Sequence, residues 1–339
     1  METRVVSGEF GVEEAVKVLA SGWPVALPTE TVYGLAANAA DAEAVARVFS
    51  IKERPEFDPL IVHITNRQML ERIVRRVDEN RAVEDLLMKK FWPGALTLVF
   101  PRRKGEGKDS SDGVVDLVTA GLETVAVRMS AHPLMRAVGE KSGFALAAPS
   151  ANRFGRISPT KAEHVLEELG GKVPLILEGG ETSHGVESTI VRVEGETLYV
   201  LRQGPVTEEM LAAFGKVISV RGGDEAGYME APGQMESHYA PGVEVVLRVA
   251  GEKGPEGIDL SQAGLLSWGA PEDREIFGKE FCLSREEELV EAAKRLFTGL
   301  RELDHSGVKV IVAELLPETG LGRAINDRLR RAAGKRTRF

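Results

Sequence analysis

The chain has 339 residues, of which 43% are hydrophobic and 28% charged, and its formal net charge is −9. The length favours two domains, and the proportions are typical of a globular protein. The acidic balance excludes broad, non-specific binding to nucleic acid, which needs a basic surface. No apolar run reaches the roughly 18 residues of a membrane span. The single cysteine, Cys282, excludes an internal disulfide and favours a cytoplasmic location.

Hydrophobic periodicity predicts helices and strands in alternation up to residue 217. Helices are expected at 11–20, 41–52, 68–77, 80–90, 133–141 and 208–214, with a further one opening at Ser158-Pro159. Strands are expected at 25–27, 60–64, 95–100, 114–118, 124–129, 144–148, 175–177, 188–193 and 198–201. Several strands follow one another with only a turn between them, which favours a twisted mixed parallel and antiparallel sheet with flanking helices.

The composition changes after this region, where a long irregular stretch begins near Gly222. A second α/β pattern follows, with strands expected at 243–249, 264–268 and 308–314 and helices at 286–304 and 322–333. Long irregular stretches are usually functional or act as linkers. We therefore predict a domain over 1–217, a linker over 218–242 and a smaller Rossmann-like α/β domain over 243–339.

Four cations stand where predicted elements end. Lys52 and Arg54 close a helix because Pro55 forces the chain out of helical geometry, and Arg128 and Arg202 end apolar strands. Arginine binds phosphate or carboxylate through two N–H groups, and lysine acts as a point charge. These positions favour an anionic, phosphate-rich ligand, although a solvated helix end is the simpler interpretation of the first two.

Several common sites are absent from the sequence. There is no G-x-x-x-x-G-K-[ST] and no G-x-G-x-x-G at a strand-to-helix junction, and Ser150 lacks a G-x-S-x-G elbow. The histidines lack metal-ligand spacing, so we expect no metal held by side chains; Mg²⁺ would be held through the phosphates of a nucleotide. His63 lies inside an apolar strand, where a lone histidine is more often a core residue than a site residue.

Taken together, the segments resemble the threonylcarbamoyl-AMP synthase family of the YrdC-like superfamily, in its long two-domain form. The matching segments are PTETVYGL (28–35), KERP (52–55), FDPLIVHI (57–64), FWPGALTLVF (91–100), TVAVRM (124–129), APSAN (148–152), GVESTIV (185–191), LRQG (201–204), SHYAPG (237–242) and ELLPETGLGRAINDRLRRAA (314–333). The resemblance covers nearly the whole chain.

The resemblance implies a YrdC-like fold and the synthesis of threonylcarbamoyl-AMP and pyrophosphate from L-threonine, bicarbonate or CO2, and ATP, with Mg²⁺. By resemblance, the threonine site comprises Thr31, His63, Arg128, the backbone of Ala148, and Ser188. The ATP site comprises Lys52, Arg54, Asp58, Thr124, Ser150, Asn152, Ser158, Arg202 and Tyr239, with Lys52 and Arg54 also expected to act in catalysis and Tyr239 to close over the nucleotide.

Asp58 stands where relatives more often have asparagine. A carboxylate beside a triphosphate is unfavourable unless it faces a cation. The product would pass to a separate transferase that modifies the adenosine next to the anticodon of certain tRNAs, and a weak contact with RNA is a further expectation.

Two alternatives remain open from the sequence. One is an RNA-binding module of the same superfamily without synthase activity, and the other is a carbamoyl-transfer domain acting on another substrate. Dependence of pyrophosphate release on threonine would distinguish the synthase from the carbamoyl-transfer domain.

Overall fold

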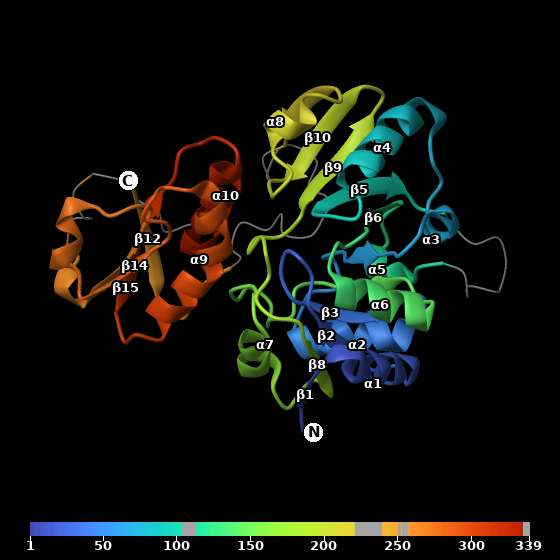
Figure 1. The fold of residues 1–339 in the computed structure, drawn as a ribbon, viewed down its shortest axis with the longest axis horizontal. Coiled ribbons are helices and arrows are strands. Elements are labelled where there is room, and N and C mark those ends of the chain that lie inside the picture. The colour runs from blue at the N-terminus through green and yellow to red at the C-terminus, as the bar shows by residue number, and fades with distance from the viewer. Residues whose placement is uncertain (104–112, 221–238, 250–251, 253–256, 335–339) are drawn as a thin grey trace. The chain divides into compact units, whose positions relative to one another are not determined.

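A computed structural model describes residues 1–103, 113–220, 239–249, 252 and 257–334. The chain forms two units (Figure 1). The first comprises 1–154, 159–182 and 187–234, and the second comprises 235–339 together with the short segments 155–158 and 183–186. The sequence pattern does not reveal that these two segments belong with the second unit. Most of the expected linker, 218–242, lies outside the described residues.

Within its described part, the first unit contains an 11-stranded sheet in the order β1-β8-β2-β3-β7-β4-β6-β5-β9-β10-β11. Its strands are β1 (Arg4–Ser7), β2 (Val25–Leu27), β3 (Gly34–Asn38), β4 (Ile61–His63), β5 (Leu96–Pro101), β6 (Thr124–Arg128), β7 (Leu146–Ala147), β8 (Leu175–Glu178), β9 (Thr189–Glu194), β10 (Thr197–Arg202) and β11 (Lys216–Ser219). Both parallel and antiparallel neighbours occur in it: β4 and β6 are parallel, whereas β5 and β6 are antiparallel. The expected mixed sheet is confirmed.

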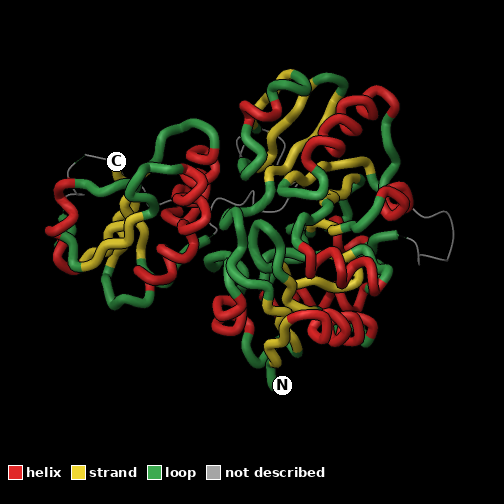
Figure 2. The backbone as a smooth tube through the Cα atoms, in the orientation of Figure 1, coloured by secondary structure: helices red, strands yellow, loops and turns green. Residues whose placement is uncertain are grey.

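Helices flank this sheet. They are α1 (Gly8–Ala20), α2 (Ala42–Lys52), α3 (Arg67–Ile73), α4 (Asp78–Phe91), α5 (Asp116–Thr119), α6 (Pro133–Ser142), α7 (Ala162–Leu169) and α8 (Glu208–Leu211). Asp41 is the N-cap of α2: its carboxylate accepts hydrogen bonds from the amides of Glu43 and Ala44. Figure 2 shows these helices in red against the yellow strands.

Two predictions about elements were wrong. Residues 114–118 do not form a strand: the amide of Val118 donates to the carbonyl of Val115, and the chain turns into α5 at Asp116. The helix expected to open at Ser158-Pro159 begins only at Ala162. The carbonyl of Pro159 accepts a hydrogen bond from the amide of Tyr33, so this backbone is committed to a loop contact.

The second unit has a four-stranded, all-parallel sheet in the order β12-β15-β13-β14 within its described residues. The strands are β12 (Glu244–Val249), β13 (Ala263–Ser267), β14 (Lys279–Cys282) and β15 (Val310–Leu315), and the helices are the short η2 (Leu260–Gln262) and η3 (Glu272–Ile276) with the longer α9 (Leu289–Asp304) and α10 (Leu321–Ala333). Helices α9 and α10 pack beside each other on this sheet (Figure 1). A parallel sheet covered by helices agrees with the expected α/β domain.

Candidate functional site

The central strands of the first unit present their polar side chains on one face of the sheet. Along β6, Val125 and Val127 belong to the main hydrophobic core, whereas Ala126 belongs to a separate cluster with Ile61 and Val99. Side chains alternate between the faces of a strand, so Thr124 and Arg128 share the face of Ala126. Four residues of strand separate Thr124 from Arg128, or about 13 Å.

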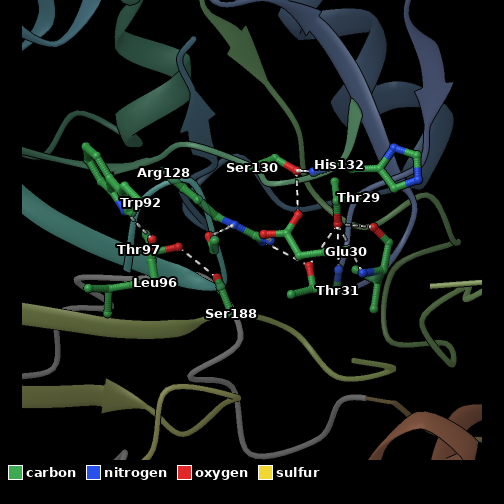
Figure 3. Close-up of polar contacts among 12 residues, drawn as sticks. Thr29, Glu30, Thr31, Trp92, Leu96, Thr97, Arg128, Ser130, His132 and Ser188 are labelled. Carbon is green, nitrogen blue, oxygen red and sulfur yellow. Dashed lines mark hydrogen bonds and ion pairs between the residues drawn. The ribbon is translucent and has the colours of Figure 1, made fainter. Parts of the chain in front are cut away.

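Arg128 is the centre of this polar face. Its side chain is buried, and its Nη2 lies 2.6 Å from Oε1 of Glu30. Its Nη1 donates to Oγ1 of Thr31 at 2.9 Å, and its Nε donates to the carbonyl of Gly94 at 3.1 Å. Figure 3 shows Glu30 and Thr31 both pointing toward the guanidinium. Arg128 and Thr31, two of the residues expected to bind threonine, are therefore in direct contact.

A compact turn holds Thr31 in place. Oγ1 of Thr29 accepts hydrogen bonds from the amides of Thr31 and Val32 and donates to the carbonyl of Val32 at 2.6 Å. The two threonine hydroxyls lie 2.9 Å apart, and because the proton of Thr29 is donated to the carbonyl of Val32, the Thr31 hydroxyl is left as the donor of this pair. Because Thr31 also accepts from Arg128, its hydroxyl has one lone pair left for a ligand.

His63 lies next to Arg128, because β4 and β6 pair these two residues in register. Burial and then the charge of Arg128 lower the pKa of His63 to about 3, so the imidazole is neutral near pH 7. Its Nδ1 is buried and has no hydrogen-bond partner among the described residues. The amide of Ala148 is used by the carbonyl of Ile61 at 3.0 Å, so only the Ala148 carbonyl could serve a ligand.

Ser188 connects the two groups of predicted site residues. Nε of Arg202 donates to the Ser188 carbonyl at 3.0 Å, and Nη2 of Arg202 donates to the Ser188 hydroxyl, also at 3.0 Å. The same hydroxyl lies 2.7 Å from Oγ1 of the fully buried Thr97 (Figure 3). A residue expected to bind threonine and one expected to bind ATP are therefore hydrogen-bonded to each other.

Lys52 is only 1% exposed and does not extend into solvent from its helix end. Its Nζ donates to the carbonyls of Ser150 and Asn152, both at 2.5 Å. Burial, followed by the charge of Arg54, lowers the pKa of Lys52 well below its usual value. In this structure Lys52 ties α2 to the loop that carries two other residues expected to bind ATP.

Arg54 pairs with Asp58. Glu53 has a left-handed φ of 55°, and α2 ends there, before Arg54. Nη2 of Arg54 lies 2.8 Å from Oδ2 of Asp58, and both side chains are buried. Burial raises the pKa of Asp58, whereas the charges of Arg54, Lys52 and Arg202 oppose that rise. Asp58 thus faces cations, which is the condition under which a carboxylate is acceptable beside a triphosphate.

The remaining predicted ATP residues divide between the two units. Thr124 and Ser150 are half-buried and Asn152 is buried in the first unit, whereas Ser158 and Tyr239 belong to the second. Tyr239 is 1% exposed; its ring stacks on Phe297 with centroids 5.5 Å apart, and the guanidinium of Arg328 lies 5.6 Å from its centroid. A role for Tyr239 over a nucleotide stays a prediction.

Sequence reasoning missed three side chains that hold the polar face together: Glu30, Thr97 and Ser130. Glu30 lies inside the segment 28–35 that was singled out, but its neighbours gave no reason to place it against a cation 98 residues later in the chain. Thr97 follows Leu96 in an apolar strand, where period-2 alternation could have assigned it to the face of Val99. Nothing in the sequence indicates Ser130.

Neither a metal cluster nor a membrane span is found in the part of the chain that the structure describes. No three or more His, Cys, Asp or Glu side chains there are grouped so that they could hold a metal ion. No helix among the described residues is long and apolar enough to cross a membrane.

Comparison with known proteins gives the family. A family model described as "Telomere recombination" matches residues 17–204, and one described as "Threonylcarbamoyl-AMP synthase, C-terminal domain" matches residues 206–334. The chain is 39% identical to the threonylcarbamoyl-AMP synthase of Bacillus subtilis strain 168, over 96% of this chain and 93% of that protein. It is 38% identical to that of Pyrococcus abyssi, over 97% and 95% of the two chains.

A solved structure agrees with these relatives. The crystal structure of P. abyssi Sua5 complexed with L-threonine is similar to this fold with a TM-score of 0.85 and 37% identity, covering 99% of each chain. Both the sequence relatives and this structure span the two units. The chain therefore belongs to the threonylcarbamoyl-AMP synthase family.

Proposed function

We propose that the protein is an L-threonylcarbamoyladenylate synthase, a nucleotidyltransferase that joins AMP to N-carboxylated threonine. The observation that carries this proposal is the pair of hydrogen bonds between Arg202 and Ser188, at 3.0 Å each. An expected ATP ligand and an expected threonine ligand are neighbours, so the two substrates would lie side by side. Membership of the family and the threonine complex of the P. abyssi relative support the same activity.

The amino acid would lie against Arg128. Its carboxylate would take the N–H groups of the guanidinium that Glu30, Thr31 and Gly94 leave unused. The lone pair left on the Thr31 hydroxyl can accept one hydrogen bond from the ligand. The Ser188 hydroxyl is hydrogen-bonded to Arg202. A site that hydrogen-bonds the threonine hydroxyl rejects an apolar isostere strongly, because its polar groups would be left unpaired.

The chemistry needs positioning more than a nucleophilic side chain. The threonine amine forms a bond to the carbon of CO2 and loses a proton, which yields a carbamate. A carbamate oxygen then attacks the α-phosphorus of ATP in line, and pyrophosphate leaves with the electrons of the broken P–O bond. Arg54 and Arg202 would stabilise the negative charge on the phosphates. Lys52 would contribute indirectly, by holding the loop of residues 150–152 in place.

Magnesium is proposed as the accompanying ion. It would be held through the phosphates of ATP. When bound, Mg²⁺ would neutralise charge on the leaving pyrophosphate. We also propose that the product passes to a separate threonylcarbamoyl transferase acting on tRNA, in the cytoplasm.

The test is an incubation of the protein with ATP, Mg²⁺, bicarbonate and isotope-labelled threonine. Mass spectrometry should detect the mixed anhydride of the labelled threonine carbamate and AMP, and pyrophosphate should be released in equal amount. Reactions without threonine are the control. Pyrophosphate release that needs bicarbonate but not threonine would favour a carbamoyl transfer to another acceptor, and no release at all would favour a binding module.

A further inference from the structure

We propose that Glu30 is a positioning residue for Arg128, setting which edge of the guanidinium receives the carboxylate of the amino acid substrate. This inference rests on the proposed function, because it assigns Arg128 to threonine. Glu30 is 6% exposed and its Oε1 lies 2.6 Å from Nη2 of Arg128. The resemblance to the family assigned no role to Glu30.

The hydrogen-bond inventory of Arg128 shows what Glu30 does. A guanidinium has five N–H groups. One on Nε is used by the carbonyl of Gly94, one on Nη1 by Thr31, and one on Nη2 faces Glu30. Two N–H groups remain, one on each Nη, and these are the groups that a ligand carboxylate would take. Without Glu30, Nη2 would have no fixed partner, and only the contacts with Gly94 and Thr31 would hold the planar guanidinium in its orientation.

Glu30 is itself held from the far side. Its Oε2 accepts a hydrogen bond from the hydroxyl of Ser130 (Figure 3). The same hydroxyl accepts from the amide of His132, which is the N-cap of α6. The carboxylate is therefore anchored at both oxygens, one to the residue it orients and one to the start of a helix. A merely solvated glutamate would need neither contact.

The charges in this part of the site fit the same role. His63, beside Arg128, is neutral near pH 7, so Glu30 balances the buried charge of Arg128 before any substrate arrives. A buried cation without a counter-ion is costly. The substrate carboxylate then meets a guanidinium that is already desolvated and fixed in orientation, and little conformational entropy is lost on binding.

The experiment compares Glu30→Gln with the full-length wild type by measuring KM for L-threonine and for ATP from threonine-dependent pyrophosphate release. Glutamine keeps the shape of the side chain and removes its charge. We expect KM for threonine to rise at least tenfold and KM for ATP to stay within twofold. Calorimetric titration with L-threonine alone should show the same loss of affinity.

The matched control is Glu84→Gln. Glu84 forms another buried pair, 2.9 Å from Nε of Arg76, and neither residue belongs to the proposed site. Its loss should leave KM for threonine unchanged. If Glu30→Gln does not fold, Ser130→Ala decides the matter, because it removes one hydrogen bond to Glu30 and should still raise KM for threonine by two- to fivefold.

Three results would overturn the inference. They are an unchanged or lower KM for threonine in the variant that folds, an equal rise in both KM values, and a fall in kcat with both KM values unchanged, which indicates only a smaller folded fraction. Failure of the proposed function would look different, because the wild type itself would then show no threonine-dependent release of pyrophosphate.

Discussion

The ion pair between Glu30 and Arg128 should make the stability of the first unit depend on pH. Burial opposes the ionisation of Glu30, but the charge of Arg128 and the hydrogen bond from Ser130 outweigh it and lower the pKa from 4.5 to about 2. Because the folded pKa lies below the unfolded one, the stabilisation is fully present above about pH 4.5 and is lost as the pH falls toward 2. The two pKa values correspond to about 3 kcal/mol near neutrality, of which about 2 kcal/mol disappears by pH 3.

Urea unfolding of the wild type and of Glu30→Gln at pH 7, 5 and 3 measures this. A Trp268→Phe background leaves Trp23 and Trp92 as fluorescent reporters of the first unit. The difference in unfolding free energy between wild type and variant should shrink by about 2 kcal/mol from pH 7 to pH 3. Burial raises the pKa of Glu84, so the corresponding difference for Glu84→Gln should not shrink. A constant difference for Glu30→Gln would refute the reasoning.

Other contacts of the site give further predictions. Thr97→Val keeps the volume of the side chain but removes the hydroxyl beside Ser188. KM for threonine should rise several-fold, because a hydrogen bond worth about 1 kcal/mol is lost. An unchanged KM would contradict a role for Thr97. A Cβ at Gly204 would lie 2.7 Å from the carbonyl carbon of Ser188. Gly204→Ala should therefore destabilise the first unit by about 1–3 kcal/mol in urea unfolding. A stability equal to that of the wild type would show that the backbone around Ser188 can shift at no cost. Tyr239→Phe keeps the ring stacked on Phe297 and should preserve KM for ATP, whereas Tyr239→Ala should raise it. Equal KM values for the two variants would argue against a role of the Tyr239 ring in ATP binding.

Much of the fold could be predicted from local pattern. The elements that were found, such as α2 with its Asp41 cap and the strand β2, carry their signal in a few consecutive residues. The strands that were missed, β1, β3, β11 and β14, are four or five residues long, and their hydrogen bonds come from other strands rather than from their own consecutive residues. Strand β3 follows directly on the turn of 28–33 and reads as part of it in the sequence.

The site divides in the same way. Its cations could be found from the sequence, because a strand or helix that ends in arginine or lysine is visible within a few residues, and the resemblance to the family named the hydroxyls and amides around them. Which group pairs with each cation could not be found from the sequence. The carboxylates that compensate Arg128 and Arg54 are Glu30 and Asp58, and only the first is remote in sequence from its partner, which is why it escaped notice.

The sequence by itself determined the family, the mixed sheet and the residue types that can hold an amino acid and a nucleotide, since each of these depends on short segments in a fixed order. The tertiary structure alone decided which groups compensate one another: Glu30 with Arg128, Thr97 with Ser188, and Lys52 with the carbonyls of residues 150 and 152. The physical reason is that hydrogen bonds and ion pairs act over about 3 Å in space, whereas the paired residues are separated by about a hundred positions along the chain.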